Sequence, residues 1–366
     1  MEDGKVGVAS KEPNQQSHIA YLDETKGGVA SPLPVLHGYR GMALHFTMMK
    51  SFVNTIRPSE ALSSGDTILS DQSLTVSSDK EIYEGVPIPL LKKLYRGMTH
   101  PIRLLPDFLI IGTQRGGTTS LYRYLKAHPC VGETSNKDLH FFDRRFHKGL
   151  AWYRGHFPTK IEKYYAQHLR GRVFVTGEAS PSYLFHPHAP KRAAQTVPHV
   201  KLIVLLRNPV SRAYSQYHHA VKLGYETLSF EEAIKGEEER TAREREKILA
   251  DGYYYSEEYK HRSYLSKGIY VDQLQAWMRL FPRDQFLILK SEDFYADPAA
   301  TVNQALAFLN LPQVESKVSE GEYKQYNNNT YSSKMDEELR KRLIEYFEPH
   351  NARLYAYLGV DFGWDR

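Results

Sequence analysis

The sequence predicts an α/β fold, in which a mostly parallel sheet is flanked by helices. Residues 108–111 and 200–206 are near-continuous apolar runs, a pattern typical of strands buried in a parallel sheet. Residues 172–176 and 285–289 are two further strand candidates, and segments that favour helices separate the runs. Strands that alternate with helices favour a parallel sheet. Ligands of such sheets bind outside the carboxyl ends of the strands.

A glycine-rich turn follows the first apolar run and leads into residues 121–125, whose apolar side chains have helical spacing. A strand, a glycine turn and a helix start form an anion site, because backbone N–H groups approach the ligand closely and the helix N-terminus carries partial positive charge. The turn fits the Walker pattern G-x-x-x-x-G-K-[ST] except that Thr118 occupies the lysine position and the cation is Arg115. The fold is therefore P-loop-like, but an ordinary ATP or GTP enzyme is disfavoured.

A second cation ends the second main strand. Arg207 follows residues 200–206, where a Walker-type enzyme usually carries the carboxylate that holds magnesium. Ser215 lies eight residues further, two turns along a predicted helix and so on the same face. This pattern predicts that a second anionic group is bound directly, without a metal ion.

Several helices are expected after this point. Ser229 begins a capping-box pattern that opens a helix. Residues 236–247 have mixed charge and are interpreted as a solvated helix face. Residues 270–281 predict a helix that packs Leu274 and Trp277 inward, and residues 335–357 predict one or two closing helices.

The two anion motifs, residues 114–120 and 206–215, together resemble those of the sulfotransferase superfamily, which uses 3′-phosphoadenosine 5′-phosphosulfate (PAPS) as donor. The resemblance implies that Arg207 and Ser215 bind the 3′-phosphate, that the product is 3′,5′-ADP and that no metal is required. Tyr264 and Lys334 lie in segments that close over the nucleotide in related enzymes. The residues implied for the 5′-phosphosulfate loop are Arg115, Gly116, Gly117, Thr118, Thr119 and Ser120.

Residues 136–143 and 149–153 resemble the carbohydrate branch of that superfamily, including its heparan sulfate enzymes. In that branch a carboxylate two residues before His-Phe-Phe is the general base, and the matching residue is Asp138, where Glu is commoner. His140 is a second candidate catalytic residue, the alternative being a hydrogen-bonded core histidine. Ala179 stands where some heparan sulfate enzymes carry a lysine that contacts the substrate.

The resemblance implies an in-line displacement that moves a sulfuryl group from PAPS to a hydroxyl or amine. Asp138 takes the proton of the acceptor, and Arg115 stabilises charge on the leaving phosphate. A saccharide is the first choice of acceptor and a small hydroxylated metabolite the second. Two alternatives remain open: an atypical P-loop kinase, which would require Mg²⁺, and a nucleotide-binding protein without enzymatic activity.

Composition sets the expected surroundings. A formal charge of +5 is too mild to imply nucleic acid as a partner. Cys130 is the only cysteine, which excludes an intramolecular disulfide and disfavours a cysteine-based zinc site. No apolar run approaches the ~18 residues of a membrane span, and the N-terminus lacks a signal-peptide pattern. We therefore expect a soluble, cytoplasmic protein.

The first hundred residues differ from the rest. Residues 59–80 are rich in Ser, Asp, Thr and Gly without periodicity, which predicts a loop or disorder. Residues 35–56 have apolar side chains at near-helical spacing, compatible with a short helix. We thus expect residues 1–95 to be an N-terminal extension, partly disordered or lid-like, and residues 96–366 to form a single catalytic sulfotransferase domain.

Overall fold

The computed structural model of the chain describes residues 90–314 and 334–365. The strands are β1 (Phe108–Gly112), β2 (Val131–Gly132), β3 (Val175–Ala179), β4 (Lys201–Leu206) and β5 (Phe286–Lys290). The helices are α2 (Leu90–Thr99), α3 (Thr118–Ala127), α4 (Gly149–Arg154), α5 (Lys160–Tyr164), α6 (Ala189–Thr196), α7 (Pro209–Lys222), α8 (Phe230–Lys235), α9 (Glu237–Ala250), α10 (Glu257–Arg262), α11 (Tyr270–Met278), α12 (Ser291–Ala296), α13 (Pro298–Phe308) and α14 (Glu337–Leu358).

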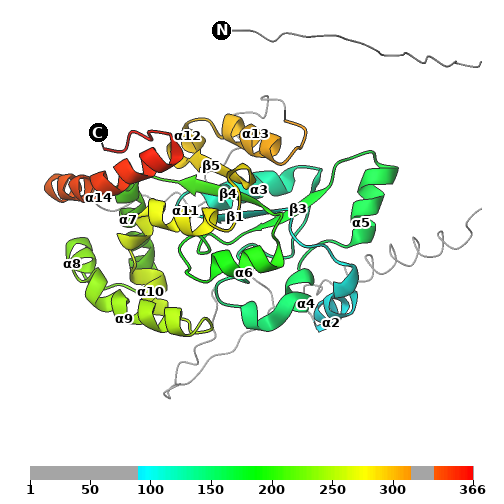
Figure 1. Ribbon diagram of the computed structural model, residues 1–366, viewed down its shortest axis with the longest axis horizontal. Helices are drawn as coiled ribbons and strands as arrows, with labels where there is room; N and C mark the ends of the chain where they lie inside the picture. The colour runs from blue at the N-terminus through cyan, green and yellow to red at the C-terminus, as the bar shows by residue number, and fades with distance from the viewer. Residues whose placement is uncertain (1–89, 315–333, 366) are drawn as a thin grey trace, which may run out of the picture. The chain divides into compact units, whose positions relative to one another are not determined.

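The five strands form one parallel sheet in the order β2-β3-β1-β4-β5 (Figure 1). β1 comes first in the chain and lies in the middle; β2 and β3 then form one side of the sheet, and β4 and β5 form the other. The strand order therefore reverses at β1, and the carboxyl end of β1 is the place where sheets of this kind bind ligands. The predicted α/β fold with a parallel sheet flanked by helices is confirmed.

Alternate residues of β1 belong to two separate cores. Leu109 and Ile111 pack in the cluster that includes side chains of α4, α6 and α11. Phe108 and Ile110 pack in the cluster formed with α3, α12 and α13. Figure 1 shows these two groups of helices on opposite faces of the sheet. Burial on both faces explains why the strand is an unbroken apolar run rather than an alternating one.

Three predicted strands are confirmed, and the fourth begins later than expected. β3 spans Val175–Ala179, whereas the sequence predicted residues 172–176. The predicted strand ended too early because Gly177 and Glu178 carry no apolar signal. Gly177 pairs with Phe108, and a Cβ there would lie 2.5 Å from the carbonyl oxygen of Phe108. β2 has only two residues and was not predicted.

The helix predictions hold with one correction. Ser229 forms the complete capping box of α8, and residues 335–357 correspond to the single helix α14. The charged run of α9 is not solvated throughout, because Glu237 is buried and accepts hydrogen bonds from the backbone N–H groups of Tyr264 and Leu265.

The N-terminal predictions fall largely beyond this description. The short helix expected within residues 35–56 and the loop expected at residues 59–80 lie outside the described residues. α2 runs across the boundary expected at residue 95, so the division into an extension and a domain stays a prediction.

Candidate active site

The predicted anion loop joins the carboxyl end of β1, in the middle of the sheet, to the start of α3. Gly117 caps α3 with a φ of +93°, a left-handed conformation that glycine adopts without strain. A Cβ on Gly116 would lie 2.8 Å from the carbonyl oxygen of Leu205 in β4, so a side chain there would force the loop away from that strand. The first N–H groups of a helix have no intrahelical partner and face outward, as an anion site requires. The first turn of α3 adds the hydroxyls of Thr118, Thr119 and Ser120.

The two predicted anion motifs meet directly. Arg115 Nε donates a hydrogen bond to Ser215 Oγ at 3.0 Å. Arg207 Nη1 donates to the carbonyl oxygen of Arg115, also at 3.0 Å, across 92 residues of sequence. Arg207 follows β4, and Ser215 is buried on the second turn of α7. The structure thus brings these three residues together at the carboxyl edge of the sheet.

A cavity of about 320 Å³ lies beside Arg207. Three of its lining residues are cations and one is a carboxylate, so it favours an anionic ligand. Lys334 is among them, as its predicted place near the nucleotide requires, but Arg340 was not predicted. The lining residues are Arg207, Ser211, Tyr214, Lys334, Met335, Glu337 and Arg340.

Tyr264 does not reach a site of this kind. Its side chain is fully buried, and its hydroxyl donates to Glu226 Oε2 at 2.9 Å. Burial, together with the Glu226 carboxylate, raises the pKa of Tyr264, so the hydroxyl stays neutral. The ring belongs to a third hydrophobic cluster, which also contains Val210 and Ala213 of α7. Tyr264 therefore supports the helix that carries Ser215, and we leave it out of the nucleotide site.

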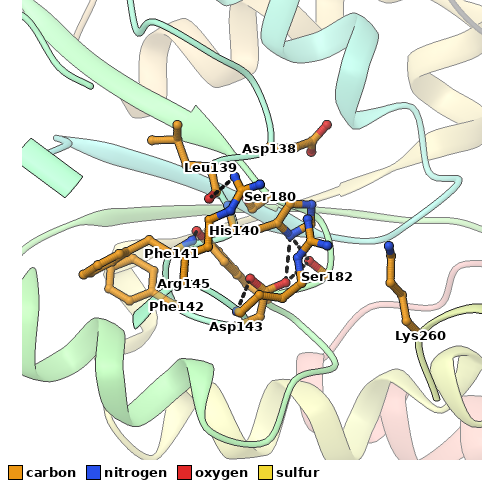
Figure 2. Close-up of polar contacts among 12 residues, drawn as sticks. Asp138, Leu139, His140, Phe141, Phe142, Asp143, Arg145, Ser180, Ser182 and Lys260 are labelled. Atoms are coloured by element: carbon orange, nitrogen blue, oxygen red, sulfur yellow. Dashed lines mark hydrogen bonds and ion pairs between the residues drawn. The ribbon is translucent and has the colours of Figure 1, made fainter. Parts of the chain in front are cut away.

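Asp138 lies in the segment between β2 and α4 and is held against the end of β3. Its backbone N–H donates to the carbonyl oxygen of Ala179 at 3.0 Å. Its carboxylate accepts a hydrogen bond from Lys137 Nζ at 2.8 Å and keeps 21% of its side chain exposed. Figure 2 shows this carboxylate directed away from the neighbouring cluster of His140 and Asp143. A partly exposed carboxylate can accept a proton from a substrate.

His140 is buried and hydrogen-bonded, as the core alternative predicted, but it also belongs to a polar cluster next to Asp138 (Figure 2). Its Nδ1 lies 2.8 Å from Asp143 Oδ2, which also accepts from Ser182 Oγ at 2.6 Å. Burial would raise the pKa of Asp143, but the charges of His140 and His186 and these hydrogen bonds hold it well below its usual range. Sequence reasoning gave no role to Asp143 or Ser182, although Asp143 is part of the quoted motif.

Aromatic rings and cations flank this segment. The Arg145 guanidinium lies over the Trp152 ring at 5.9 Å from its centroid and donates to the carbonyl oxygen of Leu139. Lys260 of α10 lies across from His140 in Figure 2, with its ammonium 5.5 Å from the centroid of Tyr255. Burial, followed by the charge of Arg144, lowers the pKa of Lys260. Arg145 and Lys260 were not predicted, because they come from separate elements. For the tyrosine run at residues 253–255, the sequence favoured exposed turn residues over stacking on sugar rings.

Comparisons with known proteins agree with this geometry. Residues 105–351 match the family model described as the sulfotransferase domain. The mouse heparan sulfate glucosamine 3-O-sulfotransferase 3A1 is 32% identical over 280 residues, covering 71% of this chain and 65% of that protein. The membrane-associated sulfotransferase kil1 of Dictyostelium discoideum is 30% identical over 325 residues, covering 71% of this chain and 66% of that protein. The chain thus spans about two thirds of the length of these relatives.

A solved structure supports the same assignment. The sulfotransferase from Alicyclobacillus acidocaldarius matches with a TM-score of 0.52 and 31% identity, over 72% of this chain and 100% of that chain. Within residues 90–314 and 334–365, no helix is both long and apolar enough to cross a bilayer. The motifs, their meeting at the carboxyl edge of the sheet and the family match agree, and the chain belongs to the sulfotransferase domain family.

Proposed function

We propose that this chain transfers a sulfuryl group from PAPS to a hydroxyl or amine of a saccharide, without a metal ion. The contact between Arg115, Arg207 and Ser215 carries the proposal, because it joins two anion-binding elements into one site at the end of the sheet. One nucleotide with phosphate groups at both its 5′ and 3′ positions fits such a site. The relatives named as heparan sulfate 3-O-sulfotransferases favour a saccharide as acceptor.

The donor half of the site is electrostatic. Arg115 and the N–H groups at the start of α3 stabilise negative charge on the leaving 5′-phosphate, where oriented donors in a partly buried site are most effective. Arg207 and Ser215 bind the 3′-phosphate, and Lys334 and Arg340 add positive charge to the neighbouring cavity. Recognition of the 3′-phosphate distinguishes PAPS from ATP. No covalent intermediate on the protein is needed, so positioning and charge stabilisation supply the rate.

The acceptor half depends on Asp138. Its carboxylate oxygen takes the proton as the acceptor oxygen or nitrogen attacks sulfur in line, a role that contributes about 10²- to 10⁴-fold to the rate. His140, two residues from the base, is held in place by the contact of its Nδ1 with Asp143. The cations over the rings of Tyr255 and Trp152 favour acceptors that carry carboxylate or sulfate groups.

Calorimetry tests the donor assignment. In EDTA the protein is expected to bind 3′,5′-ADP more tightly than 5′-AMP, and Arg207→Ala is expected to remove most of that preference. Equal affinity for the two nucleotides would refute the assignment. A preference for ATP that depends on Mg²⁺ would instead favour the kinase alternative.

The cytoplasmic location expected from the sequence stays a prediction. The kil1 relative is named as membrane-associated, so this chain is best tested directly. We expect the native protein to appear in the supernatant after high-speed centrifugation of a lysate, and recovery in the membrane pellet would contradict the expectation.

A further inference from the structure

The backbone around the proposed base is strained. Asp138 has a φ of +60° and His140 a φ of +51°, so two non-glycine residues of one short segment occupy the left-handed region. Side chains disfavour that region, and residues stay there only where surrounding structure holds them. The geometry of the proposed base therefore depends on whatever fixes this segment.

Three hydrogen bonds to the end of β3 and the residues after it hold the segment. Asp138 N–H donates to the Ala179 carbonyl oxygen at 3.0 Å. His140 N–H donates to Ser180 Oγ at 3.1 Å, and Phe141 N–H donates to the hydroxyl oxygen of Tyr183 at 2.7 Å. Two of the three acceptors are thus hydroxyl groups, which can rotate and need an acceptor of their own.

That acceptor is Glu178, which is completely buried in β3. Ser180 Oγ donates to Glu178 Oε2 at 2.9 Å, and the Tyr183 hydroxyl donates to Oε1 at 3.0 Å. The Tyr153 hydroxyl of α4 also donates to Oε1, at 2.7 Å. Glu178 therefore turns the protons of Ser180 and Tyr183 toward itself and leaves their lone pairs to the backbone of the strained segment.

We propose that ionised Glu178 is a positioning residue, which holds residues 138–141 in their strained conformation through the hydroxyls of Ser180 and Tyr183. The proposal rests on the function proposed above, in which Asp138 is the base. Glu178 touches neither nucleotide nor acceptor and acts only through the two hydroxyls.

The inference implies a dependence on pH. Burial raises the pKa of Glu178 to about 7, despite the hydrogen bonds from Tyr153, Ser180 and Tyr183. A proton on one carboxyl oxygen turns that oxygen from an acceptor into a donor, so the hydroxyl facing it must turn its own proton away. The hold on the segment weakens as the pH falls through this value.

The other titratable groups near Glu178 do not change their protonation state near neutral pH. Burial raises the pKa of Tyr122 of α3, to about 12, and raises those of Tyr153 and Tyr183, so all three stay neutral. Asp143 stays ionised despite its burial, because the charges of His140 and His186 and its hydrogen bonds hold its pKa well below its usual range. A Glu178 variant separates a limb of the pH profile caused by Glu178 from one caused by any other group.

Two tyrosine variants form a matched pair. Each of Tyr183→Phe and Tyr153→Phe removes one buried hydroxyl from Glu178 Oε1, but only Tyr183→Phe also leaves a backbone N–H of the segment without its acceptor. We expect Tyr183→Phe to lower kcat by about tenfold or more, the range for a buried donor left unsatisfied. Tyr153→Phe should stay within about threefold, and both should bind 3′,5′-ADP like the wild type. Equal loss in the two variants would overturn the proposal.

Glu178→Gln supplies the pH readout. In the wild type, kcat should rise with pH through a limb near 7, and in Glu178→Gln the profile should lose that limb and stay at the lower level. A limb that persists in Glu178→Gln belongs to another group and overturns the proposal. Should this variant fail to fold, the tyrosine pair and the exchange experiment below still decide.

Hydrogen–deuterium exchange separates this inference from the proposed function. In the complex with 3′,5′-ADP, the amides of His140 and Phe141 should become better protected as pH rises through 7, after correction for intrinsic exchange. Tyr183→Phe should remove protection at Phe141, and Tyr153→Phe should not. If this exchange pattern is found but no sulfuryl transfer is detected, the proposed function is refuted and the positioning role of Glu178 stands. Sulfuryl transfer with protection that is independent of pH, or equal in the two variants, would refute the positioning role.

Discussion

Because of Glu178, the free energy of unfolding of this protein should fall as the pH rises. The variant Glu178→Gln should lack this contribution. Burial raises the pKa of Glu178 from 4.5 to about 7, so the folded state holds its proton more tightly than the unfolded state does. Stability from this group is therefore complete below pH 4.5 and is lost as the pH rises toward 7. A shift of 2.5 units corresponds to roughly 3 kcal/mol at 1.36 kcal/mol per unit.

Denaturant unfolding at pH 5 and pH 8 measures this directly. Most of the pKa shift lies between those pH values. From pH 5 to pH 8, the free energy of unfolding of the wild type should therefore fall by roughly 2 to 3 kcal/mol more than that of Glu178→Gln. The other titrating groups are common to both proteins and cancel in the difference. A difference in unfolding free energy that stays constant from pH 5 to pH 8 would refute the reasoning, since Glu178 would then titrate alike in both states. The ionised form that we propose for activity is thus the less stable one, a known trade-off at functional sites.

Two further predictions concern the nucleotide cavity and the chain start. Arg340→Ala should weaken 3′,5′-ADP binding by about tenfold, the loss of one charge-assisted contact. Arg342→Ala should leave the affinity unchanged, because Arg342 is an exposed residue of the same helix, α14, and pairs with Glu231 of α8. Calorimetry of the two variants checks this, and equal losses would show that Arg340 makes no specific contact with the nucleotide. A chain that lacks residues 1–89 should fold and bind 3′,5′-ADP; insolubility or lost binding would place those residues in the core.

Sequence patterns could predict that the candidate donor residues meet, because these residues lie at fixed offsets from strand ends. The eight-residue spacing of Arg207 and Ser215 on one helix face was enough to expect a shared site, and the structure joins both to Arg115. The sequence could not place the side chain of Tyr264, because a tyrosine in a helix-rich segment carries no sign of whether its hydroxyl faces solvent or a buried partner. Here Glu226 takes that hydroxyl inside the core.

The positioning role of Glu178 could not be predicted from the sequence, for a different reason. Glu178 follows Gly177 in a strand with little apolar signal, and its hydroxyl partners include Tyr153, 25 residues away and on another element. A buried carboxylate is rare, so sequence alone favours an exposed one. The structure places Glu178 on an inner strand of the sheet, completely buried and bonded to Tyr153 of α4. Arg340 was not predicted either, because the apolar pattern that predicts the closing helix says nothing about which of its charged residues lines a cavity.

The central claim is that the chain transfers a sulfuryl group with Asp138 as its base, and one assay tests it most directly. The protein is incubated in EDTA with PAPS and a panel of anionic and neutral oligosaccharides, and products are detected by mass spectrometry. We predict the mass gain of one sulfo group on an anionic saccharide, with kcat lowered about 10²- to 10⁴-fold in Asp138→Asn and 3′,5′-ADP affinity retained. Transfer that persists in Asp138→Asn at more than about a tenth of the wild-type rate would contradict the role of the base. No sulfated product from any acceptor would contradict the account itself.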